Sequence, residues 1–109
     1  MPRYLLVAQH SAKPGQDAEF DAWYEHQHVP DVLACPGFNS VQRFRLDPGS
    51  KGDFDYLALY ELETDDLEAA KRELRARAGT AVMPISDAIG RGSSLYYTPL
   101  GEKKDGHDA

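Results

Sequence analysis

The stretch that decides the fold runs from residue 23 to residue 37 and reads Trp23-Tyr24-Glu25-His26-Gln27-His28-Val29-Pro30-Asp31-Val32-Leu33-Ala34-Cys35-Pro36-Gly37. It brings together two histidines, carboxylates, a tyrosine and the only tryptophan and cysteine of the chain. No other segment concentrates so many reactive side chains. If the protein is an enzyme, we expect its reaction to take place beside this stretch.

The residues around this stretch predict a helix that begins at about Asp17. Its acidic first turn suits the positive end of a helix dipole, and helical spacing places one stripe of side chains on the same face: Phe20, Trp23, Tyr24 and Gln27. Pro30 lacks an N–H and disfavours helical geometry at Val29. The helix is therefore predicted to end or kink near His28.

The remaining elements follow from apolar runs and turn residues. Strands are predicted at residues 3–10, 38–46, 54–62 and 93–100, and a second helix at 64–78 with Thr64 as its N-cap. A further short helix is predicted within 80–89. The order strand, helix, strand, strand, helix, strand is the ferredoxin-like βαββαβ arrangement. The predicted fold class is α+β, with a four-stranded antiparallel sheet and both helices on one face.

Two strands are apolar on both faces, at residues 4–8 and 56–60. Helices cover only one face of such a sheet, so the other face would be a large exposed apolar patch in a monomer. The sequence therefore predicts a homodimer whose sheets pack face to face.

Composition limits the classes of partner. The 109 residues predict one domain at 1–100 and a charged, disordered tail at 101–109. The net charge of −6 without a basic cluster argues against nucleic acid and anionic membranes as partners. Cys35 is the single cysteine, which excludes an intrachain disulfide. With no signal peptide or membrane span recognised, we expect a cytoplasmic protein.

The motif Trp23-Tyr24-x-x-x-His28-x-Pro30-Asp31, followed by Pro36-Gly37-Phe38, resembles the helix-one signature of EthD-like proteins. These belong to the dimeric α+β barrel superfamily, and the resemblance covers most of the chain. It implies a ferredoxin-like fold and places His28 at the family's helix-one histidine, which lines the cleft between helices and sheet. The superfamily hosts lactone isomerases, polyketide cyclases, cofactor-free monooxygenases, dehalogenases, haem enzymes and binding modules, so the motif does not fix the reaction.

His28 and Tyr24 are the predicted catalytic residues. An imidazole with a pKa of about 6.5 exchanges protons near neutral pH unless burial shifts it. Tyr24 precedes His28 by four residues, so the side chains can touch, and its hydroxyl can stabilise a developing oxyanion. The alternatives are a histidine at a helix end and a tyrosine in the core. His26 lies on a different helical face and is not selected.

Four further residues are candidates for substrate binding. His10, at the end of the first strand, can meet His28 across the cleft, and Tyr60 can line a pocket for an aromatic ligand. Trp23 is a candidate with core packing as its alternative, and Asp31 either orients His28 or caps a turn. Cys35 is a candidate nucleophile or a small buried apolar residue. No metal site is predicted.

The preferred hypothesis from these residues is a cofactor-free lyase, isomerase or cyclase. It would act on a small aromatic, polyketide-like or lactone compound through a histidine acid/base. The alternatives are a cofactor-independent monooxygenase, in which the substrate's own phenolate reduces oxygen, and a non-catalytic module that binds a small ligand or regulates a partner. A basic residue in an apolar cleft favours an enzyme, whereas a solvent-exposed His28 favours the module.

Overall fold

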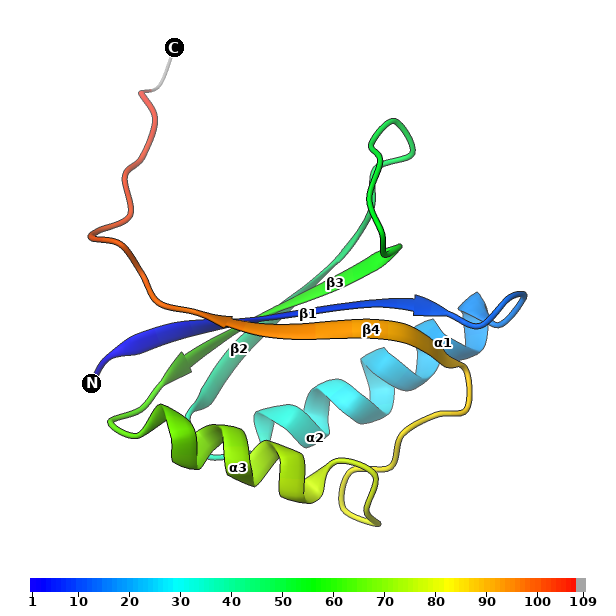
Figure 1. Cartoon of the computed structure of the whole chain (residues 1–109), viewed down its shortest axis with the longest axis horizontal. Helices are drawn as coiled ribbons and strands as arrows, with labels where there is room; N and C mark the ends of the chain where they lie inside the picture. Colours follow the sequence, from blue (N-terminus) through cyan, green and yellow to red (C-terminus); the bar gives the residue numbers. More distant parts are fainter. Residues whose placement is uncertain (108–109) are drawn as a thin grey trace.

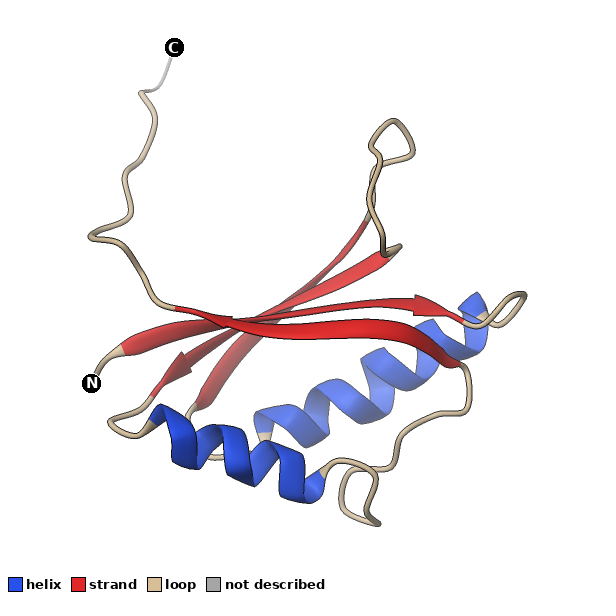
Figure 2. Ribbon diagram, viewed as in Figure 1, coloured by secondary structure: helices blue, strands red, loops and turns tan. Residues whose placement is uncertain are grey.

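The structure, a computed structural model, describes residues 1–107 as one sheet covered on one side by helices (Figures 1 and 2). The elements follow in this order: β1 (Arg3–Ala12), α1 (Asp17–Trp23), the π-helix η1 (Tyr24–His28), α2 (Val29–Leu33), β2 (Phe38–Arg45), β3 (Tyr56–Glu63), α3 (Leu67–Arg77) and β4 (Ile89–Tyr97). The four strands are antiparallel in the order β2-β3-β1-β4. The predicted ferredoxin-like α+β fold is confirmed.

Alternation along the strands divides the sheet into two faces. On the face under the helices, β1 and β3 bury small and large apolar side chains together with a tyrosine: Leu6, Ala8, Ala58, Tyr60 and Leu62. Phe20, Tyr24 and Val32 from the helical segment complete this core. The opposite face carries the intervening residues of the same strands, and no element covers it in Figure 2.

Of the two outcomes predicted near His28, an end or a kink, the helix does not end but continues through Pro30 with an irregular turn. Its path widens into the π-helix η1, in which the Val29 N–H donates to the Tyr24 carbonyl. A proline in a regular α-helix would clash with the carbonyl four residues earlier, here that of His26, and would leave it without a partner. One wider turn accommodates Pro30, which then takes the favoured first-turn position of α2.

Two local predictions are wrong for identifiable reasons. No helix forms within residues 80–89, where turns and an isolated bridge between Ala78 and Met83 carry the chain to β4. The N-cap of α3 is Asp66 rather than Thr64, because the Asp66 carboxylate accepts from the Ala69 N–H at 3.0 Å. Thr64 instead accepts from the Asp66 N–H through its hydroxyl.

The chain beyond β4 contains no helix or strand up to residue 107, and its residues are exposed. Figure 1 shows it leaving the sheet as an extended segment. The disordered tail at 101–109 stays a prediction, and residues 108–109 lie outside the described part of the chain. Within residues 1–107, no helix combines the length and apolar character that crossing a bilayer requires.

Candidate active site

A cavity of about 350 Å³ lies between the helix layer and the sheet. Its size falls in the range of small-molecule sites. The walls are mostly apolar, with two histidines, tyrosines, a serine and an arginine among them: Leu6, Ala8, His10, Tyr24, His28, Val32, Tyr60, Leu74, Arg75, Ala78, Met83, Ile85, Ile89, Ser94 and Tyr96. Four predicted site residues, His10, Tyr24, His28 and Tyr60, meet in this cavity.

His28 projects from the last residue of η1 and is packed between two aromatic rings. Its ring centroid lies 4.8 Å from that of Trp23 and 4.9 Å from that of Tyr24, which it meets edge to face. The predicted contact between Tyr24 and His28 is therefore present. The Nδ1 atom of His28 is buried and has no hydrogen-bond partner within residues 1–107. The His28 ring also lines the cavity, so a ligand there can contact the ring, although Nδ1 itself is not exposed.

Burial is the main cause and the nearby His10 a smaller one of a shift that lowers the pKa of His28 to about 4, and Asp31 opposes this shift. Burial also lowers the pKa of His10. Desolvation disfavours the charged form of an imidazole, so both rings are neutral at pH 7. A neutral imidazole can accept a proton, and the anion that this transfer leaves behind would stabilise the imidazolium. This arrangement suits acidic substrates, such as phenols and enolisable ketones.

Two tyrosine hydroxyls meet at the core side of the cavity. The hydroxyl oxygens of Tyr24 and Tyr60 are 3.0 Å apart and hydrogen-bonded. Burial raises the pKa of both phenols, so each remains protonated at neutral pH. Protonated hydroxyls can donate to an oxygen atom on which negative charge develops. The predicted electrophilic role of Tyr24 or another tyrosine stays a prediction, and the hydroxyl of Tyr60 is placed to share it.

His10 owes its place in the cavity to a glycine on the neighbouring strand. His10 on β1 pairs in register with Gly92 on β4. A Cβ atom built on Gly92 would fall on the His10 ring, inside van der Waals contact with Cδ2 and Nε2. Gly92 is therefore the residue that leaves room for the imidazole.

We expect Gly92→Ala to destabilise the protein by about 1–3 kcal/mol, because the new methyl group overpacks the His10 ring. In a His10→Ala background the same substitution should cost little. Denaturant unfolding of the single and double variants measures this coupling. Gly90→Ala is the matched control, since its Cβ would meet the backbone carbonyl of Ser11 and gain no relief from His10→Ala. An equal cost of Gly92→Ala in both backgrounds would contradict the assignment.

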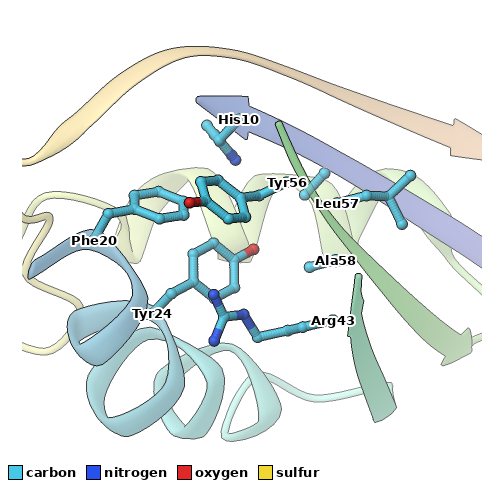
Figure 3. A pocket seen from close by; sticks show the side chains of 8 residues that line it. His10, Phe20, Tyr24, Arg43, Tyr56, Leu57 and Ala58 are labelled. Carbon is cyan, nitrogen blue, oxygen red and sulfur yellow. The ribbon is translucent and has the colours of Figure 1, made fainter. Parts of the chain in front are cut away.

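Arg43 on β2 packs its guanidinium over the ring of Tyr24. Its guanidinium carbon lies 4.9 Å from the centre of the Tyr24 ring, and Nη2 forms a 2.8 Å ion pair with Asp21. Figure 3 shows Arg43 beside the Tyr24 ring, with His10 reaching in from β1. These residues line a second, much smaller cavity of about 10 Å³, enough for roughly one water molecule. Arg43 was not selected from the sequence; the available signal was that Arg43 lies two residues after Val41 on β2 and so on the same face of the sheet.

The other candidates do not line the large cavity. Trp23 packs on His28 and donates from Nε1 to the Pro84 carbonyl at 3.1 Å. Asp31 accepts from Gln27 at 2.8 Å, and no hydrogen bond joins it to His28 within residues 1–107. Trp23 therefore supports His28 from behind, and the predicted roles of Trp23 and Asp31 toward the substrate stay predictions.

Cys35 and His26 take less reactive positions. Cys35 is buried, and its thiol lies 3.7 Å from the Asp31 carbonyl. Burial raises the pKa of this thiol, which opposes the thiolate that a nucleophile needs. His26 is exposed on the outer side of the helix. Among residues 1–107, no group of three or more His, Cys, Asp or Glu side chains is arranged to hold a metal ion.

Comparison with known proteins adds evidence on the fold. No family model and no curated protein matches the chain. Among solved structures, the haem-degrader MhuD from Mycobacterium tuberculosis, with two haems bound in its active site, has a TM-score of 0.64 and 19% identity, covering 93% of this chain and 99% of MhuD. A proposed antibiotic biosynthesis monooxygenase from Bordetella bronchiseptica has a TM-score of 0.65 and 14% identity, covering 92% and 99%.

A protein of the EthD family from Bacillus halodurans also matches, with a TM-score of 0.51 and 16% identity over 92% of this chain and all of that one. Each of these identities is below a quarter, so the matches establish the fold and not the reaction. The ferredoxin-like α+β fold that the EthD resemblance implies is thus shared with solved members of that group.

Proposed function

We propose that the protein is a monooxygenase that oxidises a small aromatic phenol or enolisable ketone, with His28 as the base that deprotonates it. The observation that carries this proposal is the neutral, unpartnered imidazole of His28 in the wall of a mostly apolar cavity. The half-buried position of His28 favours an enzyme over a binding module. Resemblance of the fold to proteins described as monooxygenases supports oxygen as the second substrate.

The reaction can be written with the substrate as its own reductant. His28 takes a proton from an activated CH₂ group, and the resulting carbanion or phenolate is electron-rich enough to reduce O₂. One oxygen atom forms the new C=O bond and the other leaves as water, so that R₂CH₂ + O₂ gives R₂C=O + H₂O. The proton held by His28 returns to the departing oxygen. The Tyr24–Tyr60 hydroxyl pair would stabilise the enolate-like oxygen of the deprotonated substrate.

A cofactor-free isomerase, lyase or cyclase is the second candidate, because its first step is the same proton abstraction. The polar side chains among those that line the cavity are proton-transfer and hydrogen-bonding groups, which serve either reaction. The two candidate reactions differ only in the second step: the carbanion reacts with O₂ in the monooxygenase, and it reacts without O₂ in the isomerase, lyase or cyclase. Oxygen dependence therefore separates them.

The test follows O₂ uptake and substrate loss together, with anthrone and 1-naphthol as substrates, each of which gains one oxygen atom on conversion to its quinone. The monooxygenase proposal expects one O₂ consumed per ketone formed and no enzyme-dependent conversion under anaerobic conditions. Haemin with an added reductant is a third arm, because MhuD is a haem degrader. Conversion that is equally fast without oxygen would overturn the proposal in favour of the isomerase, lyase or cyclase.

We further propose that the protein works as a homodimer whose partner covers the open face of the sheet. That face presents apolar side chains from all four strands: Leu5, Val7, Phe44, Leu57, Leu59, Leu95 and Tyr97. Val7 is paired with Leu59 on one side and Leu95 on the other, so the patch is continuous across the sheet. Phe44, Leu95 and Tyr97 are about half exposed, and apolar patches of this kind mark interfaces.

A further inference from the structure

The residues that line the large cavity include a positively charged side chain and no negatively charged one. The chain contains 18 acidic residues and has a net charge of −6, yet none of the residues that line this cavity is Asp or Glu. With both histidines neutral, the only formal charge in the wall is the guanidinium of Arg75 on α3. Arg75 is exposed, so its charge lies at the solvent side of an otherwise apolar cavity, where it favours an anionic ligand.

Arg75 also differs from its neighbours on α3. Lys71 is paired with Glu68 at 3.5 Å, and Arg77 with Glu73 at 2.8 Å. Arg75 forms no ion pair and no hydrogen bond with any other residue in the range 1–107. Its fork of N–H donors is therefore available to a ligand, and this geometry matches a carboxylate.

The wall near Arg75 is built to receive polar atoms. Ser94 and Tyr96, both from the edge strand β4, line the same cavity. Lys71 lies with its ammonium 5.0 Å from the centre of the Tyr96 ring, but its charge is paired with that of Glu68, so Arg75 carries the free positive charge here. Burial raises the pKa of Tyr96, and the charge of Arg75 opposes this shift. Two hydroxyls and a cation thus line the same cavity.

We propose that the ligand of this cavity is an aromatic carboxylate, whose carboxylate group binds Arg75 with Ser94 and whose rings reach His28 and the Tyr24–Tyr60 pair. The proposal deepens the proposed function, because it names the substrate class for the same site. It uses no covalent step, so it can be tested by binding alone. The cavity is mostly apolar elsewhere, which suits fused rings.

The experiment compares 2-naphthoate with 2-naphthamide, which has nearly the same shape but no charge. Trp23, the only tryptophan, packs on His28 at 4.8 Å and provides a fluorescence signal beside the cavity; calorimetry provides an independent affinity. We expect naphthoate to bind the wild-type protein about tenfold more tightly than the amide, as a charge-assisted bidentate contact allows. Arg75→Gln should abolish that preference.

Arg72→Gln is the matched control. Arg72 is an exposed residue of α3 that does not line the cavity, and its replacement removes the same charge. It should leave the preference for naphthoate unchanged. Equal binding of the two compounds by the wild type, no binding of either, or equal losses in Arg72→Gln and Arg75→Gln would each overturn the proposal. Carboxylate-selective binding without O₂-dependent turnover of any acid would leave this inference standing and contradict the monooxygenase proposal.

Discussion

His28→Ala lowers turnover by about two to four orders of magnitude, the usual cost of losing a general base, while the protein stays folded. The buried Nδ1 of His28 has no hydrogen-bond partner within residues 1–107. Removing the ring therefore strands no buried donor or acceptor, although it loses packing against Trp23 and Tyr24. Steady-state kinetics on a substrate that the wild-type protein oxidises measure the loss of turnover. Circular dichroism measures whether the variant stays folded.

His26→Ala is the control, because His26 is exposed on the outer side of the same helix turn. It should keep nearly full activity. Full activity in both variants would mean that this segment does not supply the base. If His28→Ala unfolds instead, the histidine has a structural role.

The pH dependence gives an independent check on the same residue. Since burial lowers the pKa of His28 to about 4, activity should persist well below pH 6.5 and fall only as this group becomes protonated. The free energy of unfolding should also fall as the pH is lowered. The unfolded chain binds a proton at His28 below about pH 6.5, and the folded protein does so only near 4, so stability falls as the pH drops through this interval. His28→Ala should weaken that dependence, with the remainder due to His10, whose pKa burial also lowers.

Leu95→Lys should convert the proposed dimer to a monomer at micromolar concentration. Leu95 is 50% exposed on the open face of the sheet, so a lysine there would cost a monomer little. A two-fold interface would bury this residue from both subunits, and an unpaired buried charge costs several kcal/mol. We expect the dissociation constant to rise by at least about a hundredfold. Sedimentation velocity or light scattering coupled to size exclusion measures the change.

Leu100→Lys is the matched control, because it makes the same substitution at a fully exposed residue after the last strand. It should leave the mass unchanged. A wild-type protein that is monomeric at micromolar concentration would contradict the face-to-face dimer. So would a dimer that tolerates lysine at residue 95.

The sequence was sufficient for the architecture because that information is local and periodic. The strand and helix order, the apolar strands and the helix containing Phe20 and Tyr24 all follow from spacing. His28, Tyr24, His10 and Tyr60 were predicted as site residues and do meet at one cavity. Their catalytic and binding roles stay predictions, since position alone does not establish chemistry.

What could not be predicted depends on contacts between distant segments or on one-residue changes of register. A β-bulge between Phe38 and Ser40 places Phe38 under the helices and Phe44 on the open face, although simple alternation assigned them to one face. The π-helical turn at residues 24–28 likewise adds a residue that helical spacing does not reveal. The fit of His10 over Gly92 and the position of Arg75 in the cavity wall require the register of strands and helices in space.

The hydroxyl pair of Tyr24 and Tyr60 has a consequence that appears when its hydrogen atoms are counted. Each tyrosine hydroxyl carries one hydrogen, and the hydrogen bond between the two oxygens, which are 3.0 Å apart, uses only one of these two hydrogens. The second hydrogen remains for an acceptor beside the pair. Rotation about two C–O bonds reverses which tyrosine donates, without moving any heavy atom. The pair can therefore present its spare hydrogen from either ring, so that the polarity of this wall can adapt to where a bound molecule carries its oxygen.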